Sequence, residues 1–394
     1  MTTGGYSTSR EGKADYERLI GEYGDAKAGA MLVVVAGLHG NEPAGINAFG
    51  RVIERLHRDR PGMHGRLMGF VGNRTALERE KRFIDTDMNR IWSAGSVAAL
   101  RNANPDKLSV EQNEQRDLIA HLAAVLNGHA PVIILDLHST SAYGAPFCII
   151  SDTLQNRRVA FPWSIPVILG LEEAIDGTIQ EYFGSFGHVT AAVEGGQHRD
   201  PETVHHLESV LWITLVGSGF LREKDVVDYR EHRRRLAQAC SGLPSVVEVF
   251  HRHGVSANNG FEMRPGFRNF SPVRKGEPVA RDQDGEVVAG ANGMLILPNY
   301  QNVGSDGFFL GRRVRRFWLQ LSTLARQTGL ARLMPSVPGV RRDPADDTAM
   351  IVGPGAPRRL TCGIFRLLGY QKHHDAGGEL VFRRRREGPP AFPS

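Results

Sequence analysis

The sequence predicts an α/β fold with a mostly parallel or mixed central sheet flanked by helices, followed by a small β-rich domain. The run at 31–37 is entirely apolar, and the run at 130–140 is aliphatic until it ends in a polar turn, which is typical of strands buried on both faces. Helical periodicity at 43–58 and 111–127 places helices between such strands. After about residue 240 the pattern changes to short segments rich in glycine and turn pairs, which indicates a separate β-rich region.

The remaining elements of the first part follow from the same patterns. Residues 15–24 are predicted to form a short helix, and residues 65–73 a second strand that Asn73 ends. An irregular polar segment follows at 76–92, and residues 189–196 resemble a further strand. In sheets of this class ligands bind beyond the carboxyl ends of the strands.

The second half is predicted to be smaller and more varied. Hairpin turns are expected at Asp284-Gly285 and Asn292-Gly293, because these pairs favour tight two-residue turns. We expect a basic amphipathic helix at 311–333, a Pro/Gly-rich linker at 335–359 and a terminal hairpin with a frayed tail. The domain boundaries predicted from these changes are 1–240 for a catalytic α/β domain, 241–312 for a β-rich domain, and 313–394 for a helix, linker and basic tail without an assigned role.

Composition excludes several classes of protein. The net charge of +5 is not accompanied by a nucleic-acid-binding motif, and the three scattered cysteines show no C-x-x-C pair for a disulfide framework or a cysteine zinc site. The polar N-terminus lacks a signal-peptide pattern, and no apolar run approaches the ~18 residues that span a bilayer. The default expectation is therefore a soluble cytoplasmic protein that binds neither nucleic acid nor membranes and that could form a homo-oligomer.

Polar side chains follow two of the predicted buried strands. His39 and Glu42 lie on the turn after the first strand, and His138 ends another strand in "LDLHST". Two imidazoles and one carboxylate that meet at neighbouring strand ends leave one coordination position open, as a catalytic zinc requires. Each signal alone also fits an ordinary polar strand end. Their equivalent positions predict a metal site, in which Asp136 could orient an imidazole.

Two more segments supply groups that suit hydrolysis. Glu194 ends the strand-like run "VTAAVEGG" and could take a proton from water, although a surface glutamate would give the same pattern. Arg82, Asn89 and Arg90 lie in "RFIDTDMNR", where they could converge on an anionic ligand, with Asp87 bracing the arginines. The alternative for this segment is an exposed charged loop.

Together these segments resemble the aspartoacylase and succinylglutamate desuccinylase family, a branch of the zinc carboxypeptidase-like enzymes. The motifs that carry the resemblance occur in the family's order: G-x-H-G-N-E-x-x-G at 37–45, N-R-x-A at 73–76, R-x-I-D-x-D-x-N-R at 82–90, D-L-H-S-T at 136–140 and V-E-G-G at 193–196. They cover roughly residues 30–200, and the segment 260–310 is similar to the family's C-terminal domain.

The resemblance implies a role for each residue and one zinc ion per chain. His39, Glu42 and His138 would hold the zinc, and Glu194 would be the general base. Arg82 would stabilise the developing oxyanion. The resemblance also implies that Asn89 and Arg90 would bind a carboxylate of the substrate.

The resulting functional prediction is a zinc-dependent amidohydrolase that hydrolyses the amide bond of a small N-acylated amino acid or a related carboxylate-bearing amide. Two alternatives remain: a metallocarboxypeptidase on short peptides, and a non-catalytic protein that binds an acyl metabolite. In aspartoacylases proper an arginine stands ten residues before the catalytic glutamate, whereas this chain has Gly184 there. The resemblance therefore implies that N-acetylaspartate is a poor substrate.

Overall fold

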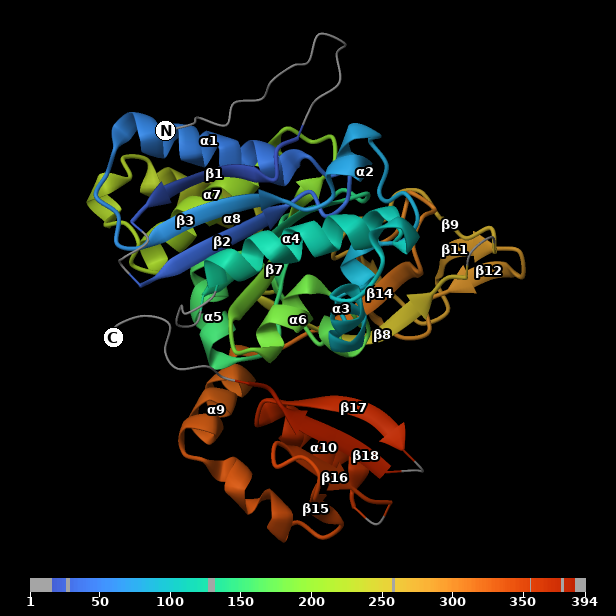
Figure 1. Ribbon diagram of the computed structural model, residues 1–394. Coiled ribbons are helices and arrows are strands. Elements are labelled where there is room, and N and C mark those ends of the chain that lie inside the picture. Colours follow the sequence, from blue (N-terminus) through green and yellow to red (C-terminus); the bar gives the residue numbers. More distant parts are fainter. Residues whose placement is uncertain are drawn as a thin grey trace.

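A computed structural model of the protein describes residues 16–25, 29–126, 132–256, 259–354, 356–376 and 379–386. Its centre is an eleven-stranded mixed sheet in the order β1-β3-β2-β4-β7-β5-β6-β8-β14-β13-β10 (Figure 1). The strands are, in sheet order, β1 (Leu19–Gly24), β3 (Arg66–Val71), β2 (Met31–Ala36), β4 (Ile133–Thr140), β7 (Val189–Gln197), β5 (Phe147–Ile149), β6 (Val167–Leu169), β8 (Val246–Gly254), β14 (Asp306–Arg313), β13 (Gly293–Ile296) and β10 (Pro272–Val273). The predicted α/β fold with a mixed sheet is confirmed.

The block that carries the site is parallel. Strands β3, β2, β4 and β7 run in one direction, whereas β5 runs against β7. Side chains of β2 alternate between two cores: Leu32 and Val34 pack in one, and Met31 and Val33 pack in the other. Because both faces are covered, almost every residue in this strand is apolar.

Helices cover both faces of the sheet. On one face lie α1 (Ala44–Asp59) and α7 (Glu202–Gly217), which pack on each other, with α8 (Tyr229–Ala239) against α7. On the other lie α3 (Ala94–Leu100), α4 (Val110–Leu126) and α6 (Ile179–Ser185), and Figure 1 shows α4 across the front of the sheet. The shorter helices are α2 (Arg74–Glu78) and α5 (Leu154–Ala160), and the 3-10 turns that concern the site are η2 (Met88–Arg90) and η5 (Leu171–Glu173).

A small second sheet extends from the end of the main one. It consists of β9 (Glu262–Met263), β11 (Pro278–Asp282) and β12 (Gly285–Val288), packed over its own apolar cluster. The predicted hairpin at Asp284-Gly285 is confirmed, since β11 and β12 pair across it. The predicted hairpin at Asn292-Gly293 is wrong. The strand before it, β12, belongs to the small sheet, and the strand after it, β13, belongs to the main sheet.

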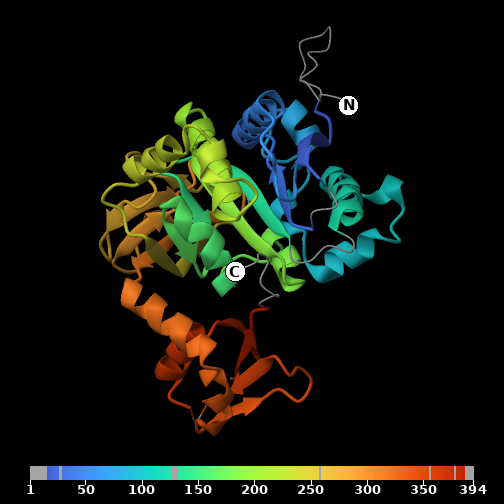
Figure 2. The ribbon, with the colours of Figure 1, turned by 90° about the vertical axis from the view of Figure 1, so that its left-hand side faces the viewer.

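Residues 316–386 form a compact α/β unit, which we call the C-terminal unit, at the bottom of Figures 1 and 2. It contains α9 (Arg316–Gln327), η7 (Leu330–Ser336), α10 (Arg358–Leu367) and a four-stranded sheet of β15 (Val340–Arg342), β16 (Ala349–Val352), β18 (Glu379–Arg384) and β17 (Tyr370–Ala376). Its core includes Phe365 and Phe382, whose rings stack 4.7 Å apart. The expected linker at 335–359 is therefore wrong, because β15 and β16 lie within it. The predicted terminal hairpin is confirmed as β17 and β18, and its expected frayed end at 387–394 lies outside the described residues.

The helix predicted at 15–24 is also wrong. Residues 19–24 form β1, which pairs antiparallel with β3 at the edge of the sheet. Pairing with a strand more than forty residues away overrides the local pattern. Within the described residues, no helix is long and apolar enough to cross a membrane.

Candidate active site

The site lies at the carboxyl ends of three neighbouring strands. His39 and Glu42 stand on the turn that follows β2, His138 is in β4, and Glu194 is in β7 directly beside His138 in the register. The turn needs glycine at two points. Gly37 has a φ of +69°, and a Cβ on Gly40 would lie 2.1 Å from the carbonyl of Ala76. The strand order therefore brings these groups to one edge of the sheet, as the sequence predicted.

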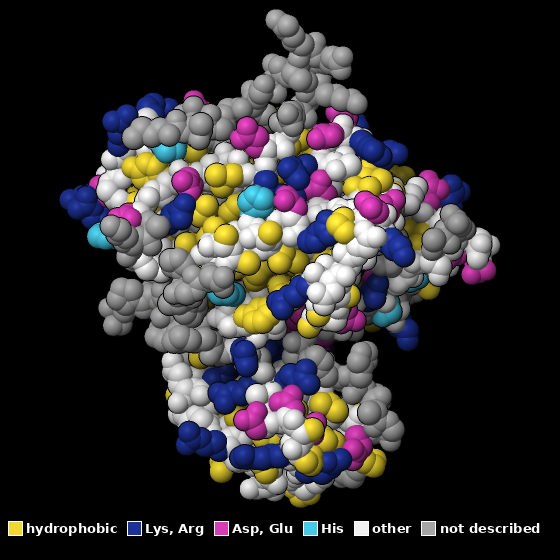
Figure 3. All heavy atoms as spheres, in the orientation of Figure 1, with side chains coloured by type: hydrophobic (Ala, Val, Ile, Leu, Met, Phe, Trp, Pro, Cys, Tyr) yellow, Lys and Arg dark blue, Asp and Glu magenta, His cyan; other side chains and the backbone are white. Residues whose placement is uncertain are grey.

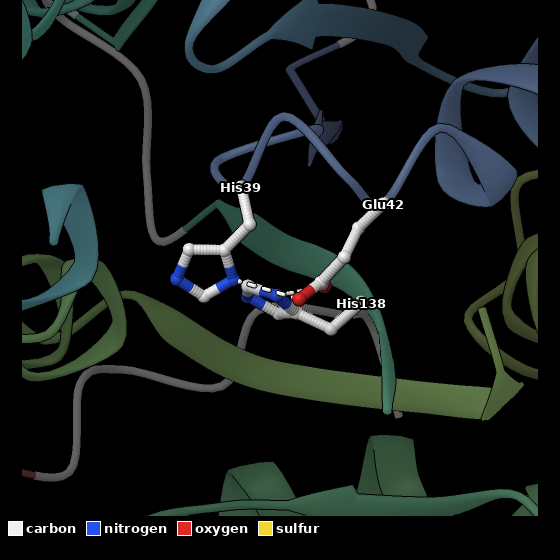
Figure 4. Close-up of side chains that lie close together, drawn as sticks. All are labelled: His39, Glu42 and His138. Atoms are coloured by element: carbon white, nitrogen blue, oxygen red, sulfur yellow. Dashed lines mark hydrogen bonds and ion pairs between the residues drawn. The ribbon is translucent and has the colours of Figure 1, made fainter. Parts of the chain in front are cut away.

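Two imidazoles converge on one carboxylate, as Figure 4 shows. The Nδ1 atom of His39 lies 3.0 Å from one oxygen of Glu42, and the Nδ1 atom of His138 lies 3.0 Å from the other. All three residues are at least 95% buried, and one ligand atom from each lies within 4.8 Å of the other two. This set has the donor types and spacing of a three-ligand metal site.

Two further carboxylates fix how the imidazoles are turned. The Nε2 atom of His138 donates to Asp136 at 2.6 Å, and the Nε2 atom of His39 donates to Asp87 at 3.0 Å. With a metal ion bound, each ring would keep its Nε2 proton on Asp87 or Asp136 and present the lone pair of Nδ1 to an ion between it and Glu42. Lone pairs that face a carboxylate are stabilised by a cation between them, so the residues present fit a bound metal ion.

The charge balance of the site supports the same conclusion. Four carboxylates, those of Glu42, Asp87, Asp136 and Glu194, gather at the site, and of the two guanidinium groups there Arg90 is already paired with Asp306, which leaves that of Arg82. Burying this excess of negative charge is unfavourable unless a cation or protons offset it. A divalent cation would offset most of it.

Burial and the neighbouring charged groups shift the pKa values of the site residues. Burial would raise the pKa of Glu42, but His39 and His138 hold it well below its ordinary value. Burial would lower the pKa of His138, but Asp136 and Glu42 raise it well above its ordinary value. Burial, together with the charge of Glu42, raises the pKa of Glu194 to about 8. One oxygen of Glu194 is buried without a hydrogen-bond partner in the described structure, which leaves it available for a proton.

The predicted substrate-binding loop is anchored from behind by a residue that sequence analysis missed. Glu111, at the start of α4, is fully buried and accepts hydrogen bonds from the backbone N–H groups of Ile84, Asp85 and Thr86 and from Asn73. A glutamate in the first turn of a helix is common, so nothing in the sequence marked this one as special. It fixes the loop that carries Arg82, Asp87, Asn89 and Arg90.

The polar groups of this loop are already engaged with the protein. Arg82 donates from Nη1 to Glu42 at 3.3 Å and from Nη2 to Asp87 at 3.0 Å. Asn89 accepts from the backbone N–H of Ile179, which leaves its NH₂ group as a donor. Arg90 donates to Asp306 at 2.7 Å. Asp306 is a second residue that sequence analysis missed, because 216 residues separate it from Arg90.

A cavity of about 140 Å³ contains all seven predicted site residues: His39, Glu42, Arg82, Asn89, Arg90, His138 and Glu194. Apolar side chains of Ile149, Leu171, Ile175 and Phe309 line its other side. Gly184 does not line it, and neither do the aromatic residues near it. Tyr182 and Phe183 pack against Trp92 instead.

The C-terminal unit reaches the wall of this cavity. Glu172, which lines the cavity, accepts a hydrogen bond from Nη2 of Arg385 at 2.6 Å, and both side chains are 7% exposed. Arg366 donates to the next residue, Glu173, at 2.9 Å. Residues of this unit therefore hold the η5 turn in place.

The structure thus combines a mixed α/β sheet with a candidate metal-ligand set at the carboxyl edge of its parallel strands. Residues 28–165 match the family model of the succinylglutamate desuccinylase/aspartoacylase catalytic domain. The resemblance to this family is thereby confirmed for residues 28–165.

Comparisons with individual proteins find relatives in the same family. An aspartoacylase from Xenopus tropicalis is 29% identical over 123 residues, which is 31% of this chain and 38% of that protein. A succinylglutamate desuccinylase from Pseudomonas fluorescens is 31% identical over 94 residues, which is 23% of this chain and 28% of that protein. These matches thus span less than half of the curated relatives. A solved succinylglutamate desuccinylase/aspartoacylase from Rhodobacter sphaeroides has the same fold, with a TM-score of 0.54 at 17% identity over 74% of this chain and 87% of that one.

Proposed function

We propose that the protein is a zinc-dependent amidohydrolase that removes the acyl group from a small N-acylated amino acid or a related carboxylate-bearing amide. The observation that carries the proposal is the convergence of His39, Glu42 and His138 beside Glu194 in one cavity. The family match to deacylases supports the reaction class.

The metal would be held by His39, Glu42 and His138, with the imidazoles oriented by Asp87 and Asp136. Zinc in such a set supplies Lewis acidity, which activates water and polarises the amide carbonyl. A bound cation would also lower the pKa of Glu194 from about 8 toward the range in which a carboxylate is a base at neutral pH.

The chain's own groups would carry out the proton transfers. Glu194 would take a proton from the attacking water on its unpartnered oxygen and then give it to the leaving nitrogen. Arg82 adds a positive charge beside the reacting carbonyl, although both of its Nη atoms already donate to carboxylates. Asn89 and Arg90 would hold the substrate carboxylate, for which Arg90 must share its guanidinium with Asp306.

The cavity favours a small substrate with an apolar part. Its volume of about 140 Å³ is below the roughly 300–1,000 Å³ of sites that hold drug-sized ligands, which disfavours a carboxypeptidase acting on peptides. The apolar wall of Leu171, Ile175 and Phe309 suits an aliphatic side chain or acyl group better than a second carboxylate. A cytoplasmic location and a homo-oligomeric state remain predictions.

The test is a screen for hydrolysis of N-acetyl, N-succinyl and longer N-acyl amino acids, together with short peptides. We expect turnover of at least one N-acyl amino acid, lost on zinc removal and restored by zinc. His138→Ala should abolish it, whereas the exposed His64→Ala should not. Cleavage of peptides alone would establish the carboxypeptidase alternative, and binding without any turnover would establish the non-catalytic one.

A further inference from the structure

A second and larger cavity, which we call the interface groove, lies between the C-terminal unit and the rest of the protein. Its volume is about 840 Å³, and it shares no lining residue with the active-site cavity. One wall comes from α9 and α10, and the other comes from the ends of β6 and β14. It is therefore a separate site for which the proposed reaction has no use.

The groove is rich in arginine. Those that line it are Arg157, Arg312, Arg313, Arg315, Arg366 and Arg385. Among the described residues, three acidic ones line it with them, Asp152, Glu173 and Glu248, so positive charges exceed negative ones by three. Figure 3 shows that Lys and Arg side chains are frequent on the C-terminal unit at the bottom of the view.

Most of these arginines are already paired, and two are not. Arg157 pairs with Asp152, and Arg366 pairs with Glu173 and Glu248. Within the part of the chain that the structure describes, the exposed side chains of Arg313 and Arg315 have neither an ion pair nor a hydrogen bond to a protein group. Two unpaired guanidinium groups two residues apart that line the same groove form a favourable site for a carboxylate.

The rest of the groove is apolar. Trp318 is 51% exposed and Leu360 is 65% exposed, and both line it beside Ile364 and Leu367. Exposed apolar side chains that line one groove together with unpaired cations are typical of binding surfaces rather than of plain solvated surface. A purely polar anion would leave these apolar side chains exposed to water.

We propose that the interface groove binds a small aliphatic carboxylate, whose charged end pairs with Arg313 and Arg315 and whose chain covers Trp318 and Leu360. The surplus of positive charge favours an anionic ligand, and the apolar wall favours a ligand with an aliphatic chain. The proposal goes beyond the proposed function and does not depend on it, because binding can be measured without turnover.

The protein contains a built-in reporter for the test. Of its four tryptophans, Trp92, Trp163 and Trp212 are at most 2% exposed, so a neutral quencher in solution reaches mainly Trp318. We would measure acrylamide quenching of the full-length protein with hexanoate, inorganic phosphate or 1-hexanol added. Hexanoate should reduce quenching in a saturable way, and phosphate and 1-hexanol should do so only at much higher concentration. Trp318→Phe should remove the signal.

Variants locate the site. Arg313→Gln combined with Arg315→Gln should weaken hexanoate binding at least tenfold, because charge-assisted contacts are lost. The matched control, Arg233→Gln, changes an exposed arginine on α8 outside the groove and should leave binding unchanged. Equal protection by phosphate or by 1-hexanol would overturn the assignment of an aliphatic carboxylate. Absent protection, or hexanoate binding that survives the double substitution, would overturn the site itself.

Discussion

The attachment of the C-terminal unit depends on a buried ion cluster whose strength can be measured by changing pH. Asp152 accepts hydrogen bonds from Arg157 at 2.5 Å and from Arg326, in α9, at 2.6 Å. Burial alone would raise the pKa of Asp152, but the charges of Arg326 and Arg157 lower it from 3.8 to about 2. The perturbation we consider is Asp152→Asn, in which a neutral amide of similar shape replaces the carboxylate.

The magnitude follows from proton linkage. A carboxyl whose pKa falls on folding stabilises the folded state above its unfolded pKa, and this stabilisation is lost as pH falls toward the folded pKa. The difference between 3.8 and about 2 corresponds to about 2 kcal/mol in the free energy of unfolding at pH 7, of which about 1 kcal/mol is lost by pH 3. Wild type and Asp152→Asn should therefore differ by about 2 kcal/mol at pH 7 and by about half of that at pH 3.

Urea unfolding followed by circular dichroism at pH 7, 5 and 3 measures this difference. The control is Asp59→Asn, which removes an exposed aspartate that also pairs with arginines and should change stability little, because solvent screens such pairs. A difference between wild type and Asp152→Asn that is the same at pH 7 and pH 3, or no larger than that of the control, would refute the reasoning.

Four further predictions concern the active site. Elemental analysis should find about one zinc per chain, and His138→Ala should lose it while its circular dichroism spectrum stays native; full metal content in that variant would disprove the ligand assignment. Glu194→Gln should lower kcat by about 10²–10⁴-fold with zinc retained, whereas the exposed Glu202→Gln should not; near-normal turnover would exclude Glu194 as the base. Catalytic efficiency on N-acetylaspartate should be lower than on N-acyl amino acids with neutral side chains, and the opposite order would contradict the inference from the missing arginine at position 184 and from the apolar cavity wall. Arg385→Ala should raise KM more than it lowers kcat, because Glu172 in the cavity wall loses its partner; an unchanged KM would show that the C-terminal unit does not shape the cavity.

The strands that carry the site could be predicted from the sequence because they are buried on both faces. Apolar runs such as 31–36 leave little choice of structure, and the polar residues directly after them stand out. Asp136 was identified as an orienting residue for the same reason, because it lies two residues before His138 on the same side of a strand.

The strands and contacts that sequence analysis missed depend on residues that lie far away in the sequence. The edge strand β1 is short, partly exposed and contains two glycines, so only its pairing with β3 defines it. The strands β15 and β16 are short and lie among prolines and glycines; β15 pairs with β16, and β16 pairs with β18, which follows later in the chain. Asp306 and Arg385 contact the site across long sequence separations, and no local pattern records such contacts.

Because the main sheet continues beyond residue 240, fragments that end there would lack strands of that sheet. Strand β8 pairs with β6 in parallel and with β14 on its other side, so residues beyond 240 complete the sheet that carries the site. A fragment that stopped at residue 240 would leave β6, whose three residues are buried, as an open edge with unpaired N–H and C=O groups. Such an edge recruits strands from other molecules. Expression of residues 1–240 alone should therefore yield aggregates, and experiments on the reaction need the chain through β14.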